Sequence, residues 1–409
     1  MTARQTTACR SCGYQELQRF LSLGFTPLAN ALITEDQLGT REETYPLELV
    51  FCSRCTLVQL TESISPEKLF REYVYFSSVS ETMLQHAEAL SSALIGSRNL
   101  DAQSLVIEVA SNDGYLLQYY KRKGVPVLGI EPATNIARVA EQRGIPTLCD
   151  FFGETLAKSL REDKFQADVI HANNVLAHVP DLNGFVRGLR RLLKPDGVVV
   201  VEVPYVYEMI THCEFDTVYH EHLSYFSLTA LDELFTRNEL TIQRVERLDI
   251  HGGTLRLFAG HGPQQNESVA ELLNDEKRRG LADIDFYKGF GERVEWLRDE
   301  LVSLLHGLKG RGFRIAAYGA SAKGATLLNY CRIGREVLDY VVDRSTVKQG
   351  LYTPGSHLKI YAPEKLLEDA PDYVLLLTWN FAGEIYEQQV EYRKRGGLFI
   401  VPVPLVQVV

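Results

Sequence analysis

The sequence predicts an α/β protein in which a small cysteine-bearing N-terminal module is followed by two Rossmann-like units. Three observations support this fold class. Two Cys-x-x-Cys pairs lie between residues 9 and 55, and residues 105–113 and 314–324 each indicate a strand, a tight loop and a helix start. A chain of 409 residues also exceeds what one hydrophobic core usually holds, which favours two or three domains.

Composition and charge are those of an ordinary globular protein and limit the possible partners. Hydrophobic residues make up 45% of the chain and charged residues 23%. The 43 basic and 53 acidic side chains give a net charge of −10, which disfavours non-specific binding to nucleic acid or to an anionic membrane. No apolar run approaches ~18 residues, and the N-terminus lacks a signal-peptide pattern. We therefore expect a cytoplasmic protein without a nucleic-acid or membrane partner.

Four of the seven cysteines form two close pairs, Cys9 with Cys12 and Cys52 with Cys55. In a reducing compartment, two such pairs are typical of Zn(II) bound by four thiolates, which leaves no open coordination position and is therefore structural. The long interval between the pairs requires an inserted loop or hairpin, which includes residues 26–30. Redox-active pairs remain an alternative, although neither follows the strand of a βαβ unit. The acidic balance of the chain and the few aromatic residues around the cysteine pairs oppose a nucleic-acid-binding zinc ribbon.

Residues 105–113 indicate the first Rossmann-like unit, with an apolar strand, Glu108 and an Asn-Asp-Gly turn. Because Ala-Ser-Asn at 110–112 replaces the glycines of a dinucleotide loop, a phosphate-free nucleoside is favoured over a diphosphate. The next apolar run, 125–130, ends in Glu131, at the roughly 20-residue interval over which an acid reaches ribose hydroxyls. This pairing resembles the S-adenosylmethionine site of class I methyltransferases. The alternative is an α/β unit with a solvated Glu131 and no ligand.

The remaining strands of this unit place polar residues at one edge of the sheet. Residues 168–174 indicate a strand whose polar end carries Asn173 and Asn174, and His178 follows it. Because ligands of open α/β sheets bind beyond the carboxyl ends of the strands, these side chains are expected to face the reaction centre. The pattern of seven strands is completed by helices at 185–193 and 232–235 and by strands at 198–203, 240–248 and 254–259, the last two joined by a tight turn at 251–253.

Residues 219–222, Tyr-His-Glu-His, form the most unusual polar cluster of the chain. Two histidines, a carboxylate and a phenol cannot all point into a core, and a plain surface loop rarely needs them together. We interpret Tyr219, Glu221 and His222 as catalytic candidates. The alternatives are a solvated turn and a second metal site that uses His220 and His222, for which no third ligand is evident.

An aromatic segment, residues 73–80, lies between the cysteine module and the first Rossmann-like unit. An extended backbone would place Tyr73 and Tyr75 on one face. These side chains either cover a ligand or pack against the protein, and general burial preferences favour packing. A helical pattern through residues 83–90 follows.

The second Rossmann-like unit follows a charged helical stretch, residues 267–309, whose apolar stripe predicts one connecting helix. A strand is predicted at 314–318 and a helix from Ala325. Between them, residues 319–324 combine Gly-rich backbone with Ser321 and Lys323 at a helix N-terminus, which is typical of an anion cradle.

This loop matches neither the NAD fingerprint nor the Walker loop. The next predicted strand, 337–342, ends in Asp343, again at the sugar-binding position. Together the loop and the acid favour a nucleoside diphosphate group. The alternative is a structural lid with a solvated loop.

The order of these features resembles the sugar C-methyltransferases of antibiotic deoxysugar pathways, in particular the C-3′-methyltransferases that act on dTDP-4-keto sugars. The resemblance covers essentially the whole chain. It implies a zinc-binding module at 1–66, an S-adenosylmethionine-dependent methyltransferase domain at 67–265, and a connecting helix with a nucleotide-sugar-binding domain at 266–409. It rests on the four cysteines and on residues 27–31, 108–113, 219–222, 251–253 and 318–324.

The residue pattern and the resemblance together assign ligands to individual residues. The expected ligands are S-adenosylmethionine, structural Zn(II) and a dTDP-linked 4-keto sugar. The expected cofactor-binding residues are Glu108, Ala110, Asn112, Asp113, Glu131, Pro132, Asn173 and Asn174. The expected substrate-binding residues are Tyr73, Tyr75, Ser321, Lys323, Gly324 and Asp343.

The implied reaction is methylation of a sugar carbon, C-3′, beside a ketone. That carbon becomes nucleophilic only after it loses a proton, so a base must form an enolate before in-line methyl transfer. His222 is the expected base, because an ordinary pKa of about 6.5 suits proton abstraction at neutral pH. Glu221 is expected to orient the imidazole or share the proton, and Tyr219 or His178 to donate a hydrogen bond to the enolate oxygen.

Several alternatives stay open at this point. The chain could be an O- or N-methyltransferase on another nucleotide-linked or small polar acceptor, or a non-catalytic zinc scaffold. The sequence does not determine which of Tyr219, Glu221 and His222 is the base. It also leaves open the amino or hydroxyl group on the methylated carbon, the nucleotide base, the stereochemistry and the oligomeric state.

Overall fold

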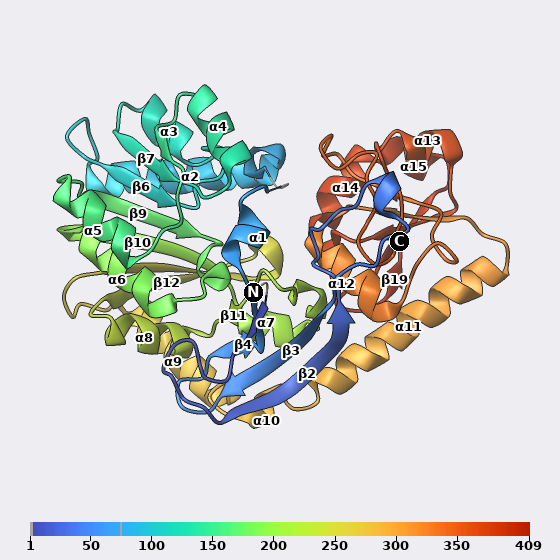
Figure 1. The fold of residues 1–409 in the computed structure, drawn as a ribbon, viewed down its shortest axis with the longest axis horizontal. Coiled ribbons are helices and arrows are strands. Elements are labelled where there is room, and N and C mark those ends of the chain that lie inside the picture. The colour runs from blue at the N-terminus through green and yellow to red at the C-terminus, as the bar shows by residue number, and fades with distance from the viewer. Residues whose placement is uncertain (1–2, 74–75) are drawn as a thin grey trace.

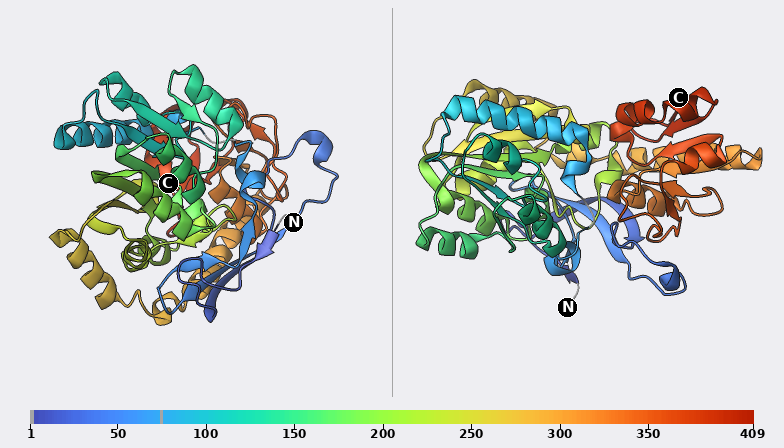
Figure 2. Two further views of the ribbon diagram at one scale, coloured as in Figure 1. Left: turned by 60° about the vertical axis from the view of Figure 1, so that its left-hand side comes forward. Right: turned by 90° about the horizontal axis from the view of Figure 1, so that it is seen from above.

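The structure is a computed structural model that describes residues 3–73 and 76–409. Figure 1 shows two α/β lobes, the first around residues 81–260 and the second after residue 310. The N-terminal hairpin, β2 (Leu17–Thr26) with β3 (Tyr45–Cys52), and the long helix α11 (Phe290–Gly310) lie at the base of the molecule and connect the lobes. Figure 2 shows the same two lobes from the side and from above. No helix of the described residues is both long and apolar enough to cross a membrane.

The first lobe contains a seven-stranded sheet, which confirms the predicted Rossmann-like unit. The strand order is β12-β13-β10-β9-β6-β7-β8. Strands β6 to β10 pair in parallel, and β13 is antiparallel to both of its neighbours, β10 and β12. The chain starts at β6, adds β7 and β8 on one side, and then adds β9 on the other. This reversal creates a topological switch point, where open α/β sheets bind ligands. The strands are β6 Val106–Val109, β7 Val127–Ile130, β8 Thr147–Leu148, β9 Ala167–Asn173, β10 Leu193–Pro204, β12 Thr241–Leu248 and β13 Thr254–Gly260.

Helices cover both faces of this sheet. Ile107 and Val109 of β6 belong to the apolar core shared with α5, α6 and α8, whereas Val106 packs with α2 and α3 on the opposite face. The alternation follows from the period of two along a strand. Between the predicted last two strands, a 3-10 helix (Ile250–Gly252) replaces the expected tight turn. The helices are α2 Glu81–Arg98, α3 Leu117–Arg122, α4 Thr134–Gln142, α5 Glu154–Glu162, α6 Leu182–Leu192, α7 Val206–Thr211 and α8 Leu228–Arg237.

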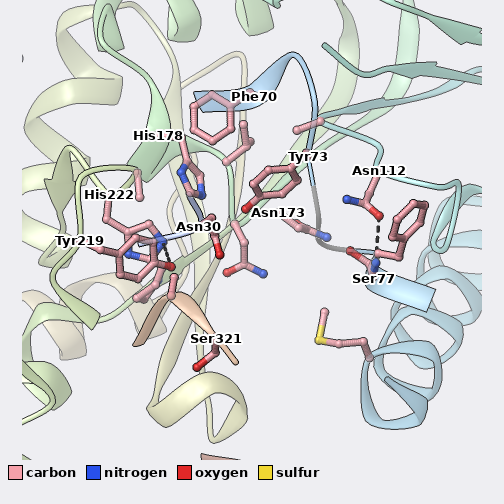
Figure 3. A pocket seen from close by; sticks show the side chains of 18 of the residues that line it. Asn30, Phe70, Tyr73, Ser77, Asn112, Asn173, His178, Tyr219, His222 and Ser321 are labelled. Atoms are coloured by element: carbon pink, nitrogen blue, oxygen red, sulfur yellow. Dashed lines mark hydrogen bonds between the residues drawn. The ribbon is translucent and has the colours of Figure 1, made fainter. Parts of the chain in front are cut away.

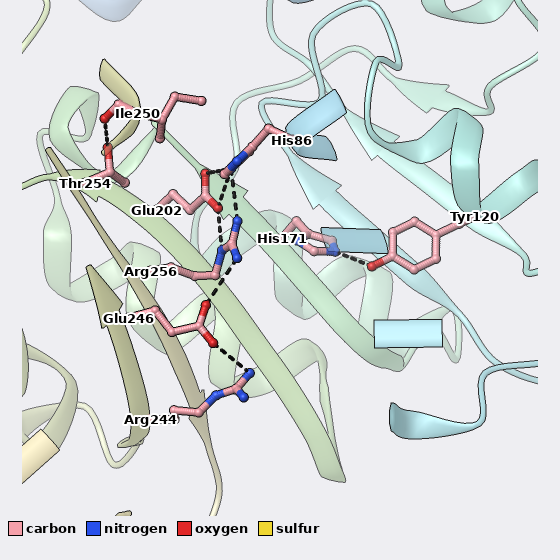
Figure 4. Close-up of polar contacts among 9 residues, drawn as sticks. All are labelled: His86, Tyr120, His171, Glu202, Arg244, Glu246, Ile250, Thr254 and Arg256. Carbon is pink, nitrogen blue, oxygen red and sulfur yellow. Dashed lines mark hydrogen bonds and ion pairs between the residues drawn. The ribbon is translucent and has the colours of Figure 1, made fainter. Parts of the chain in front are cut away.

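Helix α2 is attached to the sheet by a buried polar network (Figure 4). His86 of α2 lies 2.9 Å from a carboxylate oxygen of Glu202 in β10, and Arg256 of β13 donates to the same oxygen at 2.6 Å. Arg256 also contacts Glu246 of β12 at 3.2 Å. Ser77, just before α2, contacts the loop after β6. The network therefore helps to fix the segment that crosses the carboxyl edge of the sheet.

The cysteine module contributes a four-stranded sheet in the order β11-β4-β3-β2. The β2-β3 hairpin is the insertion that the long interval between the cysteine pairs requires. Strand β11 (Ser224–Tyr225) comes from the first lobe and pairs with β4 (Val58–Leu60), so the module is joined to the residues directly after the Tyr-His-Glu-His cluster. The remaining elements are β1 Ala3–Gln5, β5 Glu62–Ile64, which pairs with β1, and α1 Pro66–Phe70.

The second lobe is a six-stranded sheet in the order β16-β15-β14-β17-β18-β19, with parallel pairs except for β18-β19. The prediction of a strand at 337–342 is wrong for most of its length, because the N–H groups of Val337 and Leu338 bond to the Gly334 carbonyl in a turn. Only β15 (Val341–Val342) remains. The other elements are β14 Ile315–Tyr318, β16 Ile360–Tyr361, β17 Tyr373–Leu376, β18 Leu398–Val401, β19 Gln407–Val408, α12 Ala322–Cys331, α13 Lys365–Asp369, α14 Ala382–Gln388 and α15 Val390–Lys394.

Three helices replace the single predicted connecting helix: α9 (Glu267–Arg279), α10 (Ile284–Tyr287) and α11. Gly280, at φ 80°, ends α9, and Gly289, at φ 77°, precedes α11. Both take the left-handed conformation that interrupts a helix.

Candidate active site

A cavity of about 710 Å³ lies at the carboxyl ends of the strands of both lobes. Its wall includes Asn30 of the cysteine module, Tyr73, Asn112 of the loop after β6, and Ser321 of the second lobe. Figure 3 shows Asn112 at one end, the pair of Tyr219 and His222 at the other, and Tyr73 between them. The switch point of the first sheet and the Gly-rich loop of the second lobe therefore open onto one space.

Glu131, directly after β7, holds the loop that follows β6. Its carboxylate oxygens accept the backbone N–H groups of Asn112 at 2.9 Å and of Ala133 at 2.8 Å. Burial raises the pKa of Glu131 to about 7. Each oxygen keeps a second acceptor position for a ribose hydroxyl. Ala110 and Asn112 have φ of 53° and 48°, so the loop turns sharply without glycine.

The predicted cofactor-binding residues fall into two groups. Some line the cavity wall, and others lie behind it. Glu108 is buried behind the wall, and burial together with the nearby Glu131 and Asp113 carboxylates raises its pKa. Asp113 also lies behind the wall, where it pairs with Arg143 at 2.8 Å. Neither acid therefore lines the cavity, and Asp113 anchors the loop through its ion pair with Arg143. The residues on the wall are Ala110, Asn112, Glu131, Pro132, Asn173 and Asn174.

The wall fits a nucleoside ligand such as S-adenosylmethionine. The Oδ1 atom of Asn173 is buried and has no hydrogen-bond partner among the described residues, so it can accept from a ligand. Glu131 supplies an acid for a ribose, and the loop at 110–112 lacks the glycines that a pyrophosphate needs.

The other end of the cavity is defined by Tyr219 and His222. The Tyr219 hydroxyl lies 2.8 Å from His222 Nε2, and His222 Nδ1 lies 3.2 Å from the carbonyl oxygen of Thr217. Because a carbonyl only accepts, Nδ1 carries the hydrogen and Nε2 accepts from the phenol. In the neutral imidazole this pattern leaves Nε2 as the basic nitrogen, paired with a tyrosine on the cavity wall. The ring of His178 packs against that of His222, with centroids 4.8 Å apart.

Glu221 lies behind the wall and links three parts of the chain. Its side chain, 3% exposed, accepts from Asn30 Nδ2 at 2.7 Å and from the Tyr73 hydroxyl at 3.2 Å. Its backbone carbonyl accepts from His178 Nδ1 at 2.8 Å. Burial raises the pKa of Glu221 to about 7 and lowers that of His178 to about 4. These contacts suit a residue that orients its neighbours.

The two histidines of the cluster have different surroundings, which does not support a second metal site. His220 is buried and its Nε2 lies 3.3 Å from the Pro46 carbonyl, whereas His222 faces Tyr219. Within residues 3–73 and 76–409, the four cysteines are the group of metal-type ligands that come together.

The second lobe repeats the acid-and-loop arrangement of the first. Asp343 accepts the backbone N–H groups of Ala320 and Ser345, both at 2.8 Å, as Glu131 does with its own loop. Ser321 lies on the cavity wall and caps α12 by accepting from the Gly324 N–H at 3.1 Å. This cap explains why α12 starts at Ala322, three residues before the predicted start. Gly324 itself lies behind the wall.

Lys323 has an unexpected orientation. Its side chain borders the cavity, but its ammonium group is buried and lies 4.7 Å from the centroid of the Trp379 ring. Of the two predicted substrate tyrosines, Tyr73 is on the wall, and Tyr75 lies outside the described residues.

The four cysteines come together as the spacing predicts. The Sγ atoms of Cys9 and Cys55 are 3.4 Å apart, those of Cys12 and Cys52 3.6 Å, and those of Cys52 and Cys55 3.7 Å. A tetrahedral Zn(II) with bonds of about 2.3 Å requires sulfur–sulfur distances of roughly 3.8 Å. The donor set therefore fits zinc, with no position left for a substrate.

Three residues of functional interest carried little signal in the sequence. Asn30 lies within residues 27–31, which support the family resemblance, but the sequence assigned it no role in the site. Thr217 acts through its backbone carbonyl, which any residue type provides. Arg10, within the first cysteine pair, donates to the Leu60 carbonyl at 2.6 Å and reaches the Leu223 carbonyl at 3.4 Å, a contact between distant segments that spacing does not reveal.

Three protein families match successive parts of the chain. Residues 9–70 match a family described as "Putative zinc binding domain", residues 83–245 one described as "Methyltransferase domain", and residues 249–404 one described as "C-methyltransferase C-terminal domain". With the fold and the cavity, these matches define an S-adenosylmethionine-dependent methyltransferase that carries a structural zinc site.

A relative that matches the whole chain narrows this class. The chain is 36% identical over 409 residues to the C-methyltransferase NovU of Streptomyces niveus, which covers 99% of this chain and 97% of that protein. The chain therefore belongs to this family of C-methyltransferases.

Two further proteins are similar over shorter segments. A ubiquinone biosynthesis O-methyltransferase of Methylobacterium nodulans is 34% identical over 103 residues, which cover 24% of this chain and 40% of that protein. The solved structure of magnesium protoporphyrin IX methyltransferase from Synechocystis, with bound S-adenosylmethionine, is 14% identical with a TM-score of 0.34, over 44% of this chain and 79% of that one.

Proposed function

We propose that this C-methyltransferase methylates C-3′ of a dTDP-linked 4-keto deoxysugar. The supporting observation is the shared cavity, in which Glu131 and Asp343 each hold a nucleoside-type loop and the pair of Tyr219 and His222 lies on the wall. A substrate whose nucleotide binds near Asp343 would extend its sugar toward His222. In this proposal residues 67–265 bind the cofactor and residues 266–409 bind the nucleotide.

The cofactor would be held at the first end of the cavity, by Asn112, Glu131 and Asn173. When bound there, S-adenosylmethionine supplies the methyl group. The chain's own contribution at this end is orientation, because Glu131 fixes the loop and Asn112 in turn accepts the Ser77 N–H at 2.9 Å, which holds the segment before α2 across the site.

The pair of Tyr219 and His222 would remove the proton from the carbon beside the ketone. The C–H electron pair becomes part of the enolate. The proton goes directly to His222 Nε2, or it goes to the Tyr219 phenol oxygen while the phenol hydrogen passes to Nε2. In both cases the positive charge ends on His222, whose Nδ1–H remains on the Thr217 carbonyl. Neutral His178 already donates through Nδ1, so the hydrogen bond to the enolate oxygen falls to Tyr219 rather than to His178.

The experiment that tests this proposal is mass spectrometry of a dTDP-4-keto deoxysugar incubated with the protein in heavy water. One reaction contains S-adenosylmethionine and the other contains its demethylated product. We expect a methyl gain in the first reaction and deuterium at the carbon beside the ketone in the second. Methylation on oxygen or nitrogen would overturn the carbon-acid mechanism, and no change with several nucleotide sugars would overturn the substrate class.

A further inference from the structure

The loop that carries the Thr217 carbonyl is held by the second lobe. Trp379 Nε1 donates to a carboxylate oxygen of Asp216 at 2.7 Å, directly before Thr217, and the Thr326 hydroxyl donates to the Val218 carbonyl at 3.0 Å, directly after it. Both donors belong to the second lobe, Thr326 to α12. The peptide that accepts the His222 Nδ1–H is therefore fixed on both sides from outside its own lobe.

Lys323 strengthens this contact between the lobes. Its buried ammonium lies over the Trp379 ring, where a cation is attracted by the π face. It also interacts electrostatically with the carboxylates of Asp216 and Glu214. The ammonium of Lys323 and the second carboxylate oxygen of Asp216 are both buried without a hydrogen-bond partner in the described part of the chain. The lysine thus interacts with the loop of the first lobe, where it opposes the rise that burial causes in the pKa of Asp216 and Glu214.

We infer that Trp379, with Asp216 and Lys323, positions the Thr217 carbonyl and through it the basic tautomer of His222. These are positioning residues, because they act through His222 and not on the substrate. Lys323 belongs to this group rather than to the expected anion cradle. The inference rests on the proposed role of His222, and it means that the base is correctly oriented only when the second lobe is docked.

The first test replaces Trp379 by Phe, which keeps a ring and removes the donor. We expect kcat for methyl transfer to fall at least ~10-fold, a part of the ~10² to 10⁴-fold that a positioned base provides. The KM for the nucleotide sugar and the Kd for S-adenosylmethionine should stay within about twofold. Trp296→Phe is the matched control, because Trp296 is 53% exposed on α11 and should leave kcat unchanged.

A double-mutant cycle separates positioning from general damage. If Trp379 acts through His222, the double variant that combines His222→Asn and Trp379→Phe should have the same kcat as His222→Asn alone. If the two substitutions instead lower kcat by independent factors, the inference is overturned, but His222 can still be the base. Thr326→Val, which removes the second contact with little change in shape, provides the same comparison if Trp379→Phe does not fold.

A measurement without substrate keeps the inference separate from the proposed reaction. In protein with ¹⁵N-labelled histidine, the Nδ1–H signal of His222 is assigned by its loss in His222→Asn. We expect Trp379→Phe to shift or broaden this signal and Trp296→Phe to leave it unchanged; an unshifted signal would overturn the inference. If His222→Asn retains full kcat, the proposed base is wrong whatever the spectrum shows.

Lys323→Met tests the role given to the lysine. Positioning predicts a lower kcat with an unchanged KM for the nucleotide sugar. A raised KM with an unchanged kcat would instead assign Lys323 to the substrate anion and remove it from the group.

Discussion

At the residue scale, a backbone atom decides which nitrogen of His222 is basic. The carbonyl of Thr217 takes the hydrogen of Nδ1, so Nε2 is left as the acceptor beside Tyr219. The side chains of this pair were visible in the sequence as an unusual polar cluster. Thr217 was not, because a carbonyl leaves no mark in the residue type. Sequence reasoning therefore identified the side chains that are proposed to react but not the backbone contact that selects the tautomer of His222.

Replacement of His222 by Asn should lower kcat for methyl transfer by ~10² or more, since it removes the basic nitrogen. Binding of S-adenosylmethionine should not change, because its expected contacts lie at the other end of the cavity. Initial rates and calorimetry would measure the two effects. His212→Asn, at a half-exposed histidine outside the cavity wall, is the control. An unchanged kcat in His222→Asn would contradict the proposed base.

Glu221 should make stability depend on pH. Burial raises its pKa from the ordinary 4.5 to about 7, so between these values the folded state binds the proton more tightly than the unfolded state does. Its contribution to stability is therefore complete below about pH 4.5 and is lost as the pH rises through 7. For a shift of this size the loss is on the order of 3 kcal/mol at most.

The variant Glu221→Gln cannot ionise and should avoid this loss. We expect its melting temperature, relative to that of the unaltered protein, to rise between pH 5 and pH 8. Glu162→Gln, at an exposed carboxylate of α5, should show no such trend. A pH-independent difference for Glu221→Gln would show that the carboxyl group is ionised throughout this range.

At the scale of elements, the zinc module contacts the candidate active site directly. Arg10 in the first cysteine pair donates to the Leu60 carbonyl, β4 pairs with β11 just after the Tyr-His-Glu-His cluster, and Asn30 donates to Glu221. A two-residue strand such as β11 has no periodicity, so its pairing could not be predicted from the sequence. The cysteine spacing predicted the metal site, but not that the module forms part of the cavity wall.

Cys52→Ser should release the zinc and abolish methyl transfer, because a structural zinc site stabilises its module and the module positions Glu221. Binding of S-adenosylmethionine should persist, since Asn112 and Glu131 belong to the central sheet. Metal analysis, rate measurements and calorimetry would follow the three properties. Cys149→Ser, at an exposed cysteine, is the control. Full activity in a zinc-free Cys52→Ser protein would contradict this link.

The central parallel strands of the first lobe, β6, β9 and β10, were the most predictable elements, because they are largely buried and form apolar runs that end in polar residues. The strand before Asp343 was predicted to be longer than it is, for a related reason. Residues 337–342 are apolar and buried, but their first part forms a turn, and burial alone does not distinguish the two. The acid at the end, Asp343, was still placed correctly, since it follows the short strand that remains.

At the scale of the whole molecule, the two lobes repeat one arrangement, an acidic side chain that accepts two backbone N–H groups, and they share one cavity. The cysteine module also contacts the second lobe, where His357 Nε2 lies 2.6 Å from a carboxylate oxygen of Glu42 and Ile33 forms a bridge with Tyr352. The module therefore binds to both lobes and holds the two loop-and-acid sites across one space. This arrangement suits a reaction between two ligands, each with its own nucleoside.

The arrangement predicts that the binding of each ligand can be weakened without affecting the binding of the other. Glu131→Gln should lower the affinity for S-adenosylmethionine at least ~10-fold, because the amide accepts fewer hydrogen bonds from the loop and the ribose, and should leave the affinity for dTDP unchanged. Asp343→Asn should do the reverse. Calorimetric titration of each variant with each ligand gives four values that test this pattern. Because the two acids lie in different lobes, loss of both affinities in one variant would mean that the lobes do not bind their ligands independently. An Asp343→Asn protein with normal affinity for dTDP would mean that the nucleotide binds elsewhere.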